Sequence, residues 1–336
     1  MTMHDVQCIF KLFHLILNTL KKQFVNELKK DEPVNDFFVI SNVSQRPYKN
    51  TSKGNYLQLS VQDKTGTISA KLWSEGGETS RLSQHLSDAQ VVKLSGKAEE
   101  YQGRLSIVLT EPPEKIENYE SPEDFISKTD KDISKMLQDL KDEISKISDP
   151  HIKQLLELFS NDDEFMKKYS TSPAAKVMHH NFIGGLLEHV LNLISASKTI
   201  HSSHPELNLD LLIAASILHD IGKIDEYDVG LKIDISDDGR FYGHISIGYR
   251  LIASKIEKIS DFPKELERKI LHIILSHHGE KQYGSPVEPI FPEAVAFHNI
   301  DKTDASIQNA KQSIQSDNQE GDWTYDTLQK RFYYKK

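Results

Sequence analysis

The chain has 336 residues, a hydrophobic content of 38%, a mean hydropathy of -0.50 and a formal net charge of -9. This length allows two domains of ordinary size, each with its own core, and the composition is that of a soluble globular protein. The negative charge argues against binding of nucleic acid by bulk attraction alone, but it allows a local basic groove or a carboxylate-lined metal site. Cys8 is the only cysteine, which excludes an intrachain disulfide and a thiolate metal site and favours a reducing, cytoplasmic compartment.

Apolar residues at helical spacing predict an N-terminal helix over residues 1–32. Lys11 and His14 interrupt its apolar stretch, which is shorter than the ~20 residues of a membrane span. It also lacks the positively charged start and the small-residue cleavage site of a signal peptide. We therefore expect an amphipathic helix that packs on its own chain or on a second subunit, with no membrane contact. The alternative is a start codon assigned too far upstream, so that residues 1–21 are no part of the mature chain.

Between residues 33 and 115 the hydrophobic period changes to two, which predicts a β domain. Five strands are expected, at residues 37–40, 57–61, 68–72, 91–95 and 105–109. Asp63-Lys-Thr-Gly66 and Gln102-Gly103 are typical of hairpin turns, and a short polar helix is expected at residues 79–86. Five strands with a helix after the third resemble the OB-fold, a partly open barrel that binds single-stranded nucleic acid or sugars.

Cations and aromatic residues are interleaved in this β domain, as in a groove that follows a nucleic-acid backbone and stacks its bases. The candidate nucleic-acid-binding residues are Tyr48, Lys49, Tyr56, Lys71, Trp73 and Arg104. The alternative interpretation is a solvated barrel with ordinary surface lysines.

Pro112-Pro113 and the acidic stretch Glu114–Glu123 predict a linker. We assign residues 116–160 to this linker and a following helical segment. Ser121-Pro-Glu-Asp is typical of a capped helix start. Helices are expected at residues 130–147, 151–159, 162–169, 174–201, 209–221, 244–259, 263–278 and 292–314, so that residues 161–315 form an all-α domain. A small hairpin over residues 231–241 should turn at Asp238-Gly239, and the basic, aromatic tail 316–336 should be docked or frayed.

The helix predicted over residues 209–221 is apolar and ends on His219 and Asp220. Such groups are costly to bury unless they are paired or bind a metal. Gly222 fits the left-handed residue that commonly ends a helix. The pair is therefore a candidate for two metal ligands held on a rigid helix.

Other histidines and one aspartate surround this pair in the order H, HD, H, HH, D. The seven candidate ligands are His189, His219, Asp220, His244, His277, His278 and Asp301. Their order resembles the HD-domain metallophosphohydrolases that carry enough ligands for two metals. In a two-metal interpretation one ion has the ligands His189, His219, Asp220 and Asp301. Asp220 then bridges to a second ion held by His244, His277 and His278.

Imidazole and carboxylate ligands suit Mn²⁺, Fe²⁺, Zn²⁺, Ni²⁺ or Co²⁺. Two such ions polarise a phosphoryl group and activate a water molecule, so no Ser or Cys nucleophile is needed. The candidate catalytic residues are Asp220, as the bridge, and Lys223, which would neutralise a phosphate oxygen unless it is an ordinary surface lysine. Asp304 and Glu188 are expected to orient ligand imidazoles. For four other histidines of the region a buried structural role is the credible interpretation: His179, His180, His272 and His298.

An OB-like domain ahead of an HD domain, preceded by Lys22-Gln-Phe-Val-Asn-Glu-Leu-Lys29, resembles the YhaM family of 3′–5′ exoribonucleases. The motifs that carry the resemblance are His179-His-Asn-Phe-Ile-Gly-Gly-Leu-Leu-Glu-His189, Leu218-His-Asp-Ile-Gly-Lys223, Ser276-His-His-Gly-Glu280 and Tyr283-Gly-Ser-Pro-Val-Glu-Pro289. The resemblance covers about residues 22–310. It implies manganese-stimulated removal of mononucleotides from single-stranded RNA or DNA.

Two other functions stay open. One is an HD phosphohydrolase of small or cyclic nucleotides, which the OB-like domain disfavours, as does Tyr283-Gly-Ser-Pro286 in place of the Gly-Tyr-Pro signature of cyclic-dinucleotide enzymes. The other is a single-stranded nucleic-acid-binding protein with a non-catalytic HD domain. Such a protein should lack some of the ligands, and none is missing here. Assembly into a homo-oligomer is also possible.

Overall fold

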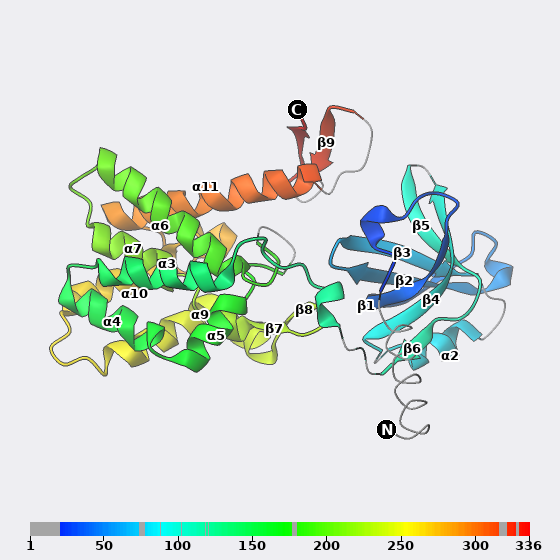
Figure 1. The fold of residues 1–336 in the computed structure, drawn as a ribbon, viewed down its shortest axis with the longest axis horizontal. Coiled ribbons are helices and arrows are strands. Elements are labelled where there is room, and N and C mark those ends of the chain that lie inside the picture. Colours follow the sequence, from blue (N-terminus) through cyan, green and yellow to red (C-terminus); the bar gives the residue numbers. More distant parts are fainter. Residues whose placement is uncertain are drawn as a thin grey trace, which may run out of the picture. The chain divides into compact units, whose positions relative to one another are not determined.

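The computed structural model describes residues 21–336 except for residues 74–77, 88, 102, 118, 120, 177–179, 316–320 and 327–328. The chain divides into two compact units, one ending at Ser127 but including Gly230–Lys232, and one formed by the remaining residues. The first unit is a β-barrel and the second is mostly helical (Figure 1). Within the described ranges, no helix has the length and apolar character that crossing a membrane requires.

The first unit contains a closed five-stranded barrel, which confirms the OB-like fold. Its strands are β1 (Pro33–Pro47), β2 (Asn55–Asp63), β3 (Gly66–Leu72), β4 (Val91–Tyr101) and β5 (Arg104–Leu109). The antiparallel β1–β4 pairing and the parallel β3–β5 pairing close the ring in the order β1-β2-β3-β5-β4. The helix α2 (Glu78–His85) lies between β3 and β4 in the chain, as expected. Alternate residues of β2, namely Leu57, Leu59 and Val61, fill the interior.

A sixth strand, β6 (Glu114–Ile116), lies where the sequence predicts a linker. It pairs antiparallel with β4, where Val91 lies opposite Ile116. The linker prediction is wrong for these residues, because the edge of β4 offers backbone groups that the segment can pair. At Ser121-Pro-Glu-Asp only a 3-10 turn forms, η3 (Pro122–Asp124), in place of the predicted helix start.

The predicted N-terminal helix is wrong for residues 21–32, and residues 1–20 lie outside the described residues. Only a 3-10 turn forms in this segment, η1 (Val25–Glu27). Carboxylates of the barrel accept its backbone N–H groups: Asp36 accepts from Lys22 at 2.6 Å, and Asp63 accepts from Val25 at 2.8 Å. These tertiary hydrogen bonds replace those that a helix would make.

The second unit packs its helices around one hydrophobic core. The helices are α3 (Ile133–Ser145), α4 (Pro150–Ser160), α5 (Asp163–Thr171), α6 (Gly185–Ser203), α7 (Leu209–Leu218), α8 (Lys223–Glu226), α9 (Asp237–Ile256), α10 (Lys264–Ser276) and α11 (Pro292–Gln315). Asp132, Asp149, Asp162 and Asn208 cap α3, α4, α5 and α7 by accepting backbone N–H groups of the first turn. The helix α7 is buried from Leu211 to Leu218 and contacts α4, α6, α10 and α11. It is therefore the central post that its apolar sequence predicts.

The helix expected at residues 174–201 begins only at Gly185, after Gly184 with φ +84°. The preceding loop, of which residues 177–179 are not described, packs closely on the start of α6. An added Cβ at Gly185 would lie 2.1 Å from the carbonyl oxygen of His180. This packing replaces the predicted first turns of the helix and holds His180 beside α6.

The expected hairpin after α8 turns at a different place. It pairs β7 (Tyr227–Val229) with β8 (Ile233–Ile235), so Asp238-Gly239 is not its turn. Those two residues instead lie in the first turn of α9, because Ser236 caps that helix by accepting the N–H of Gly239 at 2.9 Å. A second small hairpin, β9 (Trp323–Asp326) with β10 (Arg331–Tyr334), follows α11 in the tail, where no strand was predicted.

Candidate functional site

The helical unit brings all seven candidate ligands together. His189 lies in α6, His219 and Asp220 follow α7, His244 follows the break in α9 at Gly243, His277 and His278 follow α10, and Asp301 lies in α11. Most of these residues lie at or near helix ends, where rigid elements fix their positions.

The first group of ligand atoms belongs to His189, His219 and Asp301, and all three atoms lie within 4.8 Å of one another. The Nε2 atom of His189 is 3.2 Å from Oδ1 of Asp301, and the Nε2 atom of His219 is 4.0 Å from the same oxygen. Both imidazoles are completely buried. Such a largely buried group of donors is suited to hold a cation.

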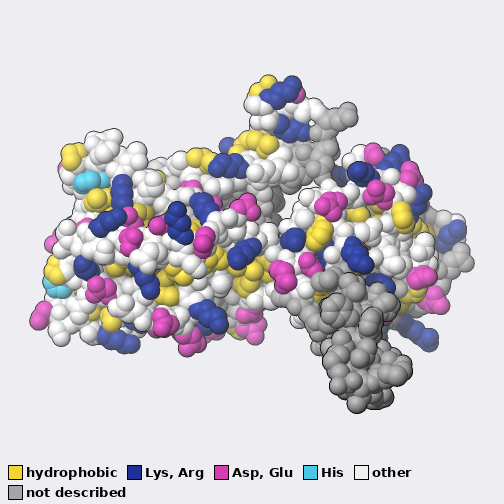
Figure 2. Space-filling view, in the orientation of Figure 1, with side chains coloured by type: hydrophobic (Ala, Val, Ile, Leu, Met, Phe, Trp, Pro, Cys, Tyr) yellow, Lys and Arg dark blue, Asp and Glu magenta, His cyan; other side chains and the backbone are white. Residues whose placement is uncertain are grey.

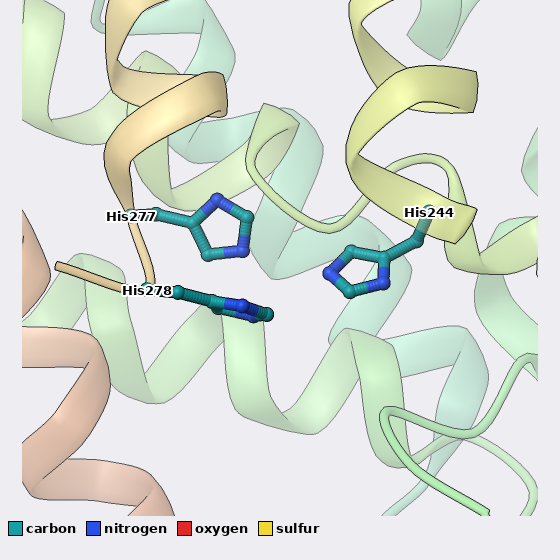
Figure 3. A group of neighbouring side chains, drawn as sticks. All are labelled: His244, His277 and His278. Atoms are coloured by element: carbon teal, nitrogen blue, oxygen red, sulfur yellow. The ribbon is translucent and has the colours of Figure 1, made fainter. Parts of the chain in front are cut away.

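The second group is formed by His244, His277 and His278, whose ligand atoms also lie within 4.8 Å of one another. Figure 3 shows the three rings turned toward a common space, from the end of α10 and the second part of α9. The ring centroids of His277 and His278 are 4.3 Å apart. Adjacent residues therefore supply two donors to the same group.

Asp220 lies between the two groups. Its Oδ2 atom is 3.1 Å from Nε2 of His219, in the first group. Its Oδ1 atom is 3.6 Å from Nε2 of His244 and 3.7 Å from Nε2 of His277, in the second. One carboxylate thus faces both groups, which is the position that a ligand shared by two cations must occupy.

Close packing of two backbone segments brings Asp220 to His244. An added Cβ at Gly222 would lie 2.1 Å from the carbonyl oxygen of His244 and 2.7 Å from the backbone nitrogen of Gly248. Gly222 has φ -69° and ψ -14°, so the prediction of a left-handed helix end is wrong. A side chain is excluded there by the neighbouring helix rather than by the backbone angles.

Each ligand imidazole is held through its Nδ1 atom. The partners are Asp304 for His189 (2.7 Å), the Ser216 carbonyl for His219 (3.1 Å), Glu226 for His244 (3.1 Å), the Ile274 carbonyl for His277 (2.8 Å) and the Tyr283 carbonyl for His278 (3.1 Å). Because a carbonyl oxygen can only accept, Nδ1 of His219, His277 and His278 carries the proton. The Nε2 atom of His219 then presents its lone pair to the first group, and those of His277 and His278 present theirs to the second.

The buried Nε2 atoms of His219, His244 and His277 have no hydrogen-bond partner, and neither has Oδ1 of Asp220. Unpaired buried polar atoms are costly and call for an explanation. Convergent imidazole nitrogens and carboxylate oxygens with outer partners on each ring are the donor set of a divalent metal site. The residues therefore fit divalent metal binding.

Electrostatics gives most of these groups the protonation state that metal ligands need. Burial opposes ionisation of Asp220, but nearby positive charge, including that of Lys223, outweighs it and holds the pKa of that carboxyl well below its usual range. Burial lowers the pKa of His277, and the neighbouring His278 lowers it further, so His277 is neutral. His189 differs: burial opposes its charge, but hydrogen bonds to Asp301 and Asp304 raise the pKa of His189 to about 9.

Lys223 is buried, and its Nζ atom donates to Oδ2 of Asp220 at 2.5 Å. It is therefore not an ordinary surface lysine. Its observed partner is a proposed ligand, so its charge keeps Asp220 ionised.

The two acids expected to orient imidazoles behave differently. Asp304 accepts from Nδ1 of His189 and is also 3.1 Å from Nε2 of His180 and 3.1 Å from the amide nitrogen of Asn192. Glu188 instead accepts from the hydroxyl of Thr129 at 2.5 Å and pairs with Lys131 at 3.2 Å, so it does not orient a ligand ring. Sequence reasoning missed Glu226 and Asn192, which carry no motif of their own.

The histidines outside the seven candidate ligands differ in their surroundings. His298 donates from Nδ1 to the carbonyl of His277 at 2.7 Å, so it supports the chain beside a candidate ligand. His272 packs on Phe291, and burial lowers its pKa. His180 was expected to be structural only, yet it lies in a third group of donor atoms with His189 and Asp304. His179 lies outside the described residues.

In the barrel, three of the candidate nucleic-acid-binding residues form one aromatic cluster. The ring centroids of Tyr56 and Trp73 are 4.6 Å apart, and Tyr48 is 5.6 Å from each. Trp73 is half exposed. Lys71 lies near the end of β3, and Trp73 directly follows the last residue of that strand, so both lie at the same end of β3.

The two remaining candidates, Arg104 and Lys49, lie elsewhere in the barrel. Arg104 precedes Ser106, which pairs with Ser69, so it lies near the opposite end of β3 from Trp73. Lys49 is exposed in the connection between β1 and β2. On the face in Figure 2, basic and acidic side chains are interspersed, so this face offers a strand no broad basic surface.

Comparisons with known proteins agree with these two units. A family model described as the HD domain matches residues 186–306, and one described as an OB-fold nucleic acid binding domain matches residues 39–111. The curated 3′-5′ exoribonuclease YhaM of Oceanobacillus iheyensis is 32% identical over 269 residues, which is 76% of this chain and 80% of that protein. All seven candidate ligands fall inside the HD match, and the barrel falls largely inside the other.

Proposed function

This chain belongs to the YhaM family of 3′–5′ exoribonucleases, and on that premise we propose that it shortens single-stranded RNA from the 3′ end and releases nucleoside 5′-monophosphates. The observation that carries this proposal is Asp220, which faces one group of donors with Oδ2 and another with Oδ1. Two-cation hydrolases hold their metals about 3.5–4 Å apart, and one carboxylate that faces both groups of donors suits such a close pair. We extend the proposal to single-stranded DNA, since base stacking does not depend on the 2′-hydroxyl.

We propose that His189, His219, Asp220 and Asp301 hold one divalent cation. His244, His277 and His278 would hold a second, for which Asp220 would also be a ligand, and we propose Mn²⁺ as the metal. When bound, two such cations polarise a phosphoryl group and activate a water molecule near neutral pH. The unpaired Nε2 atoms of His219, His244 and His277 and the ionised carboxyl of Asp220 support this assignment.

The surrounding residues hold the ligands in place. Asp304 and Glu226 accept the Nδ1 protons of His189 and His244, which orients the rings. Lys223 keeps Asp220 ionised through their direct contact, and contact of its ammonium group with a phosphate oxygen stays a prediction.

We propose that the barrel binds the strand and performs no chemistry. The cluster of Tyr48, Tyr56 and Trp73 offers aromatic faces on which successive bases can stack, and Lys71 and Lys49 supply charge for the backbone. Arg104 would contact a different part of the strand, because it lies elsewhere on the barrel. A cytoplasmic location, which the single cysteine supports, completes the proposal.

Digestion of end-labelled RNA tests the function directly. With Mn²⁺, 5′-labelled RNA should give a descending ladder, and 3′-labelled RNA should release a labelled mononucleotide at once. Digestion should stall at a stable hairpin, because paired bases are unavailable for stacking. A ladder from the 3′-labelled substrate, or cutting of a circular single strand, would contradict the proposal.

The same assay distinguishes the two alternative functions. Rapid hydrolysis of free or cyclic nucleotides with intact RNA would indicate a small-nucleotide phosphohydrolase, and tight RNA binding without hydrolysis would indicate a binding protein. The variant Asp220→Asn should lose hydrolysis and bind less metal while its circular dichroism stays near that of the wild type. Light scattering of the same samples measures whether a homo-oligomer forms.

A further inference from the structure

Three exposed aromatic residues are linked to the second group of proposed ligands by chain position or by a backbone hydrogen bond, and the mechanism above does not use them. Phe241, Tyr242 and Tyr283 are 82%, 54% and 59% exposed. A single exposed aromatic residue needs no explanation, but three near one candidate site do.

The chain connects these rings to the ligands. Tyr242 precedes His244 by two residues, so their Cα atoms lie within about 8 Å. Between them Gly243 (φ +66°, ψ 156°) breaks the helix, which separates the turn that carries Phe241 and Tyr242 from the one that begins at His244. On the other side, the carbonyl oxygen of Tyr283 accepts the Nδ1 proton of His278 at 3.1 Å. The backbone of Tyr283 is thus bonded directly to a proposed ligand.

The candidate ligands also differ in their exposure to solvent. His189, His219 and His277 are buried, whereas His244, His278 and Asp301 are partly exposed. Phe241, Tyr242 and Tyr283 adjoin two of these three open positions. The two open positions at the second group, His244 and His278, are therefore the ones to which the segments of these aromatic residues are joined.

A cation accompanies the rings. The Cζ atom of Arg250 lies 5.9 Å from the centroid of the Tyr242 ring, and Tyr242 and Phe241 lie 6.1 Å apart between ring centroids. Aromatic faces beside an arginine are the combination that single-strand-binding proteins use for a base and its phosphate.

We propose that Phe241, Tyr242 and Tyr283 form a stacking platform for the nucleobase at the 3′ end of the strand. The platform rests on the proposed exonuclease function and deepens it, since it positions the terminal nucleotide at the metal centre. Every base has a flat face, so the platform should favour the presence of a base over its identity. It would act in addition to the aromatic cluster of the barrel.

Two RNA oligonucleotides test this platform. They are identical except that the 3′-terminal nucleotide carries its base in one and is abasic in the other. The rate of the first cleavage is measured with Mn²⁺ at low substrate concentration, for the wild type and for Phe241→Ala, Tyr242→Ala and Tyr283→Ala. Phe241→Tyr keeps a ring at the same position, and Phe332→Ala removes a ring that is 66% exposed on β10 as the matched control.

Stacking on an aromatic ring changes affinity by roughly fivefold to 150-fold. The wild type should therefore remove the base-bearing nucleotide faster than the abasic one by a factor in that range. The alanine variants should bring the ratio toward one by slowing only the base-bearing substrate, whereas Phe241→Tyr and Phe332→Ala should keep the wild-type ratio. Anisotropy with a cleavage-resistant phosphorothioate strand should show the same pattern in affinity.

Equal slowing of both substrates, or an unchanged ratio in all three alanine variants, would overturn the platform. An unchanged ratio together with a smaller mass in light scattering would assign these rings to an interface between copies instead. If the wild type removes no 3′ nucleotide from either substrate, the proposed function itself has failed, which is a different result from an unchanged ratio.

Discussion

At the scale of single residues, the orientation of the proposed ligands is decided outside the site. Asp304 has no place among the seven candidate ligands, yet it holds His189 through Nδ1 at 2.7 Å and binds His180 and Asn192 as well. While Asp304 holds Nδ1 of His189, the Nε2 atom of the same ring lies 3.2 Å from Oδ1 of Asp301. Asp304 is therefore a positioning residue for the first cation.

The variant Asp304→Ala should lower the affinity for Mn²⁺ by about 10- to 100-fold, since loss of an outer partner of a ligand imidazole has effects of this size. Isothermal titration of the metal-free protein measures it. The matched control is Glu188→Ala, which removes a neighbouring carboxylate that bonds to Thr129 and not to a ligand. Equal affinities in the two variants would show that Asp301 alone orients the ring.

At the scale of elements, the site depends on how closely the turn between α7 and α8 approaches α9. Gly222 lies against the carbonyl of His244 and the backbone of Gly248, which leaves no room for a Cβ atom. This contact sets the separation of Asp220 from His244 and therefore of the two groups of ligands.

The variant Gly222→Ala should push α9 away, although its backbone angles suit alanine. We expect a loss of about 1–3 kcal/mol in the free energy of unfolding, as for other overpacked positions, and fewer bound metal ions per chain. Thermal unfolding and metal analysis measure the two effects. Gly230→Ala is the control, because nothing lies within 4 Å of an added Cβ there. A normal metal content in Gly222→Ala would contradict the proposed role of this contact.

At the scale of the whole molecule, the two units have separate hydrophobic cores. Each also contains one of the two tryptophans: Trp73 in the barrel and Trp323 in the hairpin that follows α11. The fluorescence of one tryptophan can therefore report each unit by itself.

Metal removal should destabilise only the helical unit. A ligand at about 100 times its dissociation constant adds about 2.7 kcal/mol to the free energy of unfolding, or roughly 5–10 °C in Tm for a unit of this size. In Trp73→Phe, which leaves Trp323 as the reporter, chelation should lower Tm by that amount and Mn²⁺ should restore it. In Trp323→Phe the transition of the barrel should not move. A shift of equal size in both variants would show that the units unfold together.

The division of work between the units predicts a separation of binding from chemistry. The double variant Tyr56→Ala/Trp73→Ala should weaken the binding of long single-stranded RNA by fivefold or more and leave the cleavage of a dinucleotide unchanged. Anisotropy and the release of mononucleotide measure the two quantities. Tyr101→Ala, which removes an exposed ring near the β4–β5 turn, is the control. Unchanged affinity for long RNA in the double variant would mean that the aromatic cluster has another role.

The amino-acid sequence alone determined those features that depend on local pattern and on residue type. Period-two alternation predicts the barrel strands, and the Asp63–Gly66 turn is where it was expected, because burial on one side of a strand leaves a direct record in the sequence. The apolar run of α7 likewise predicts a buried helix that ends at His219. The types and order of the candidate ligands, and with them the family, could also be inferred from the sequence.

Only the tertiary structure decided the features that depend on contacts between distant residues. Asp304 lies 115 residues from the histidine that it holds, and Glu226 lies 18 residues from His244. Residues 21–32 have a helical hydrophobic pattern but bind the carboxylates of the barrel, and Gly222 is needed because another helix crosses it. Hydrogen bonds and close approaches of this kind join segments whose local patterns are unrelated, so no periodicity or motif in the sequence records them.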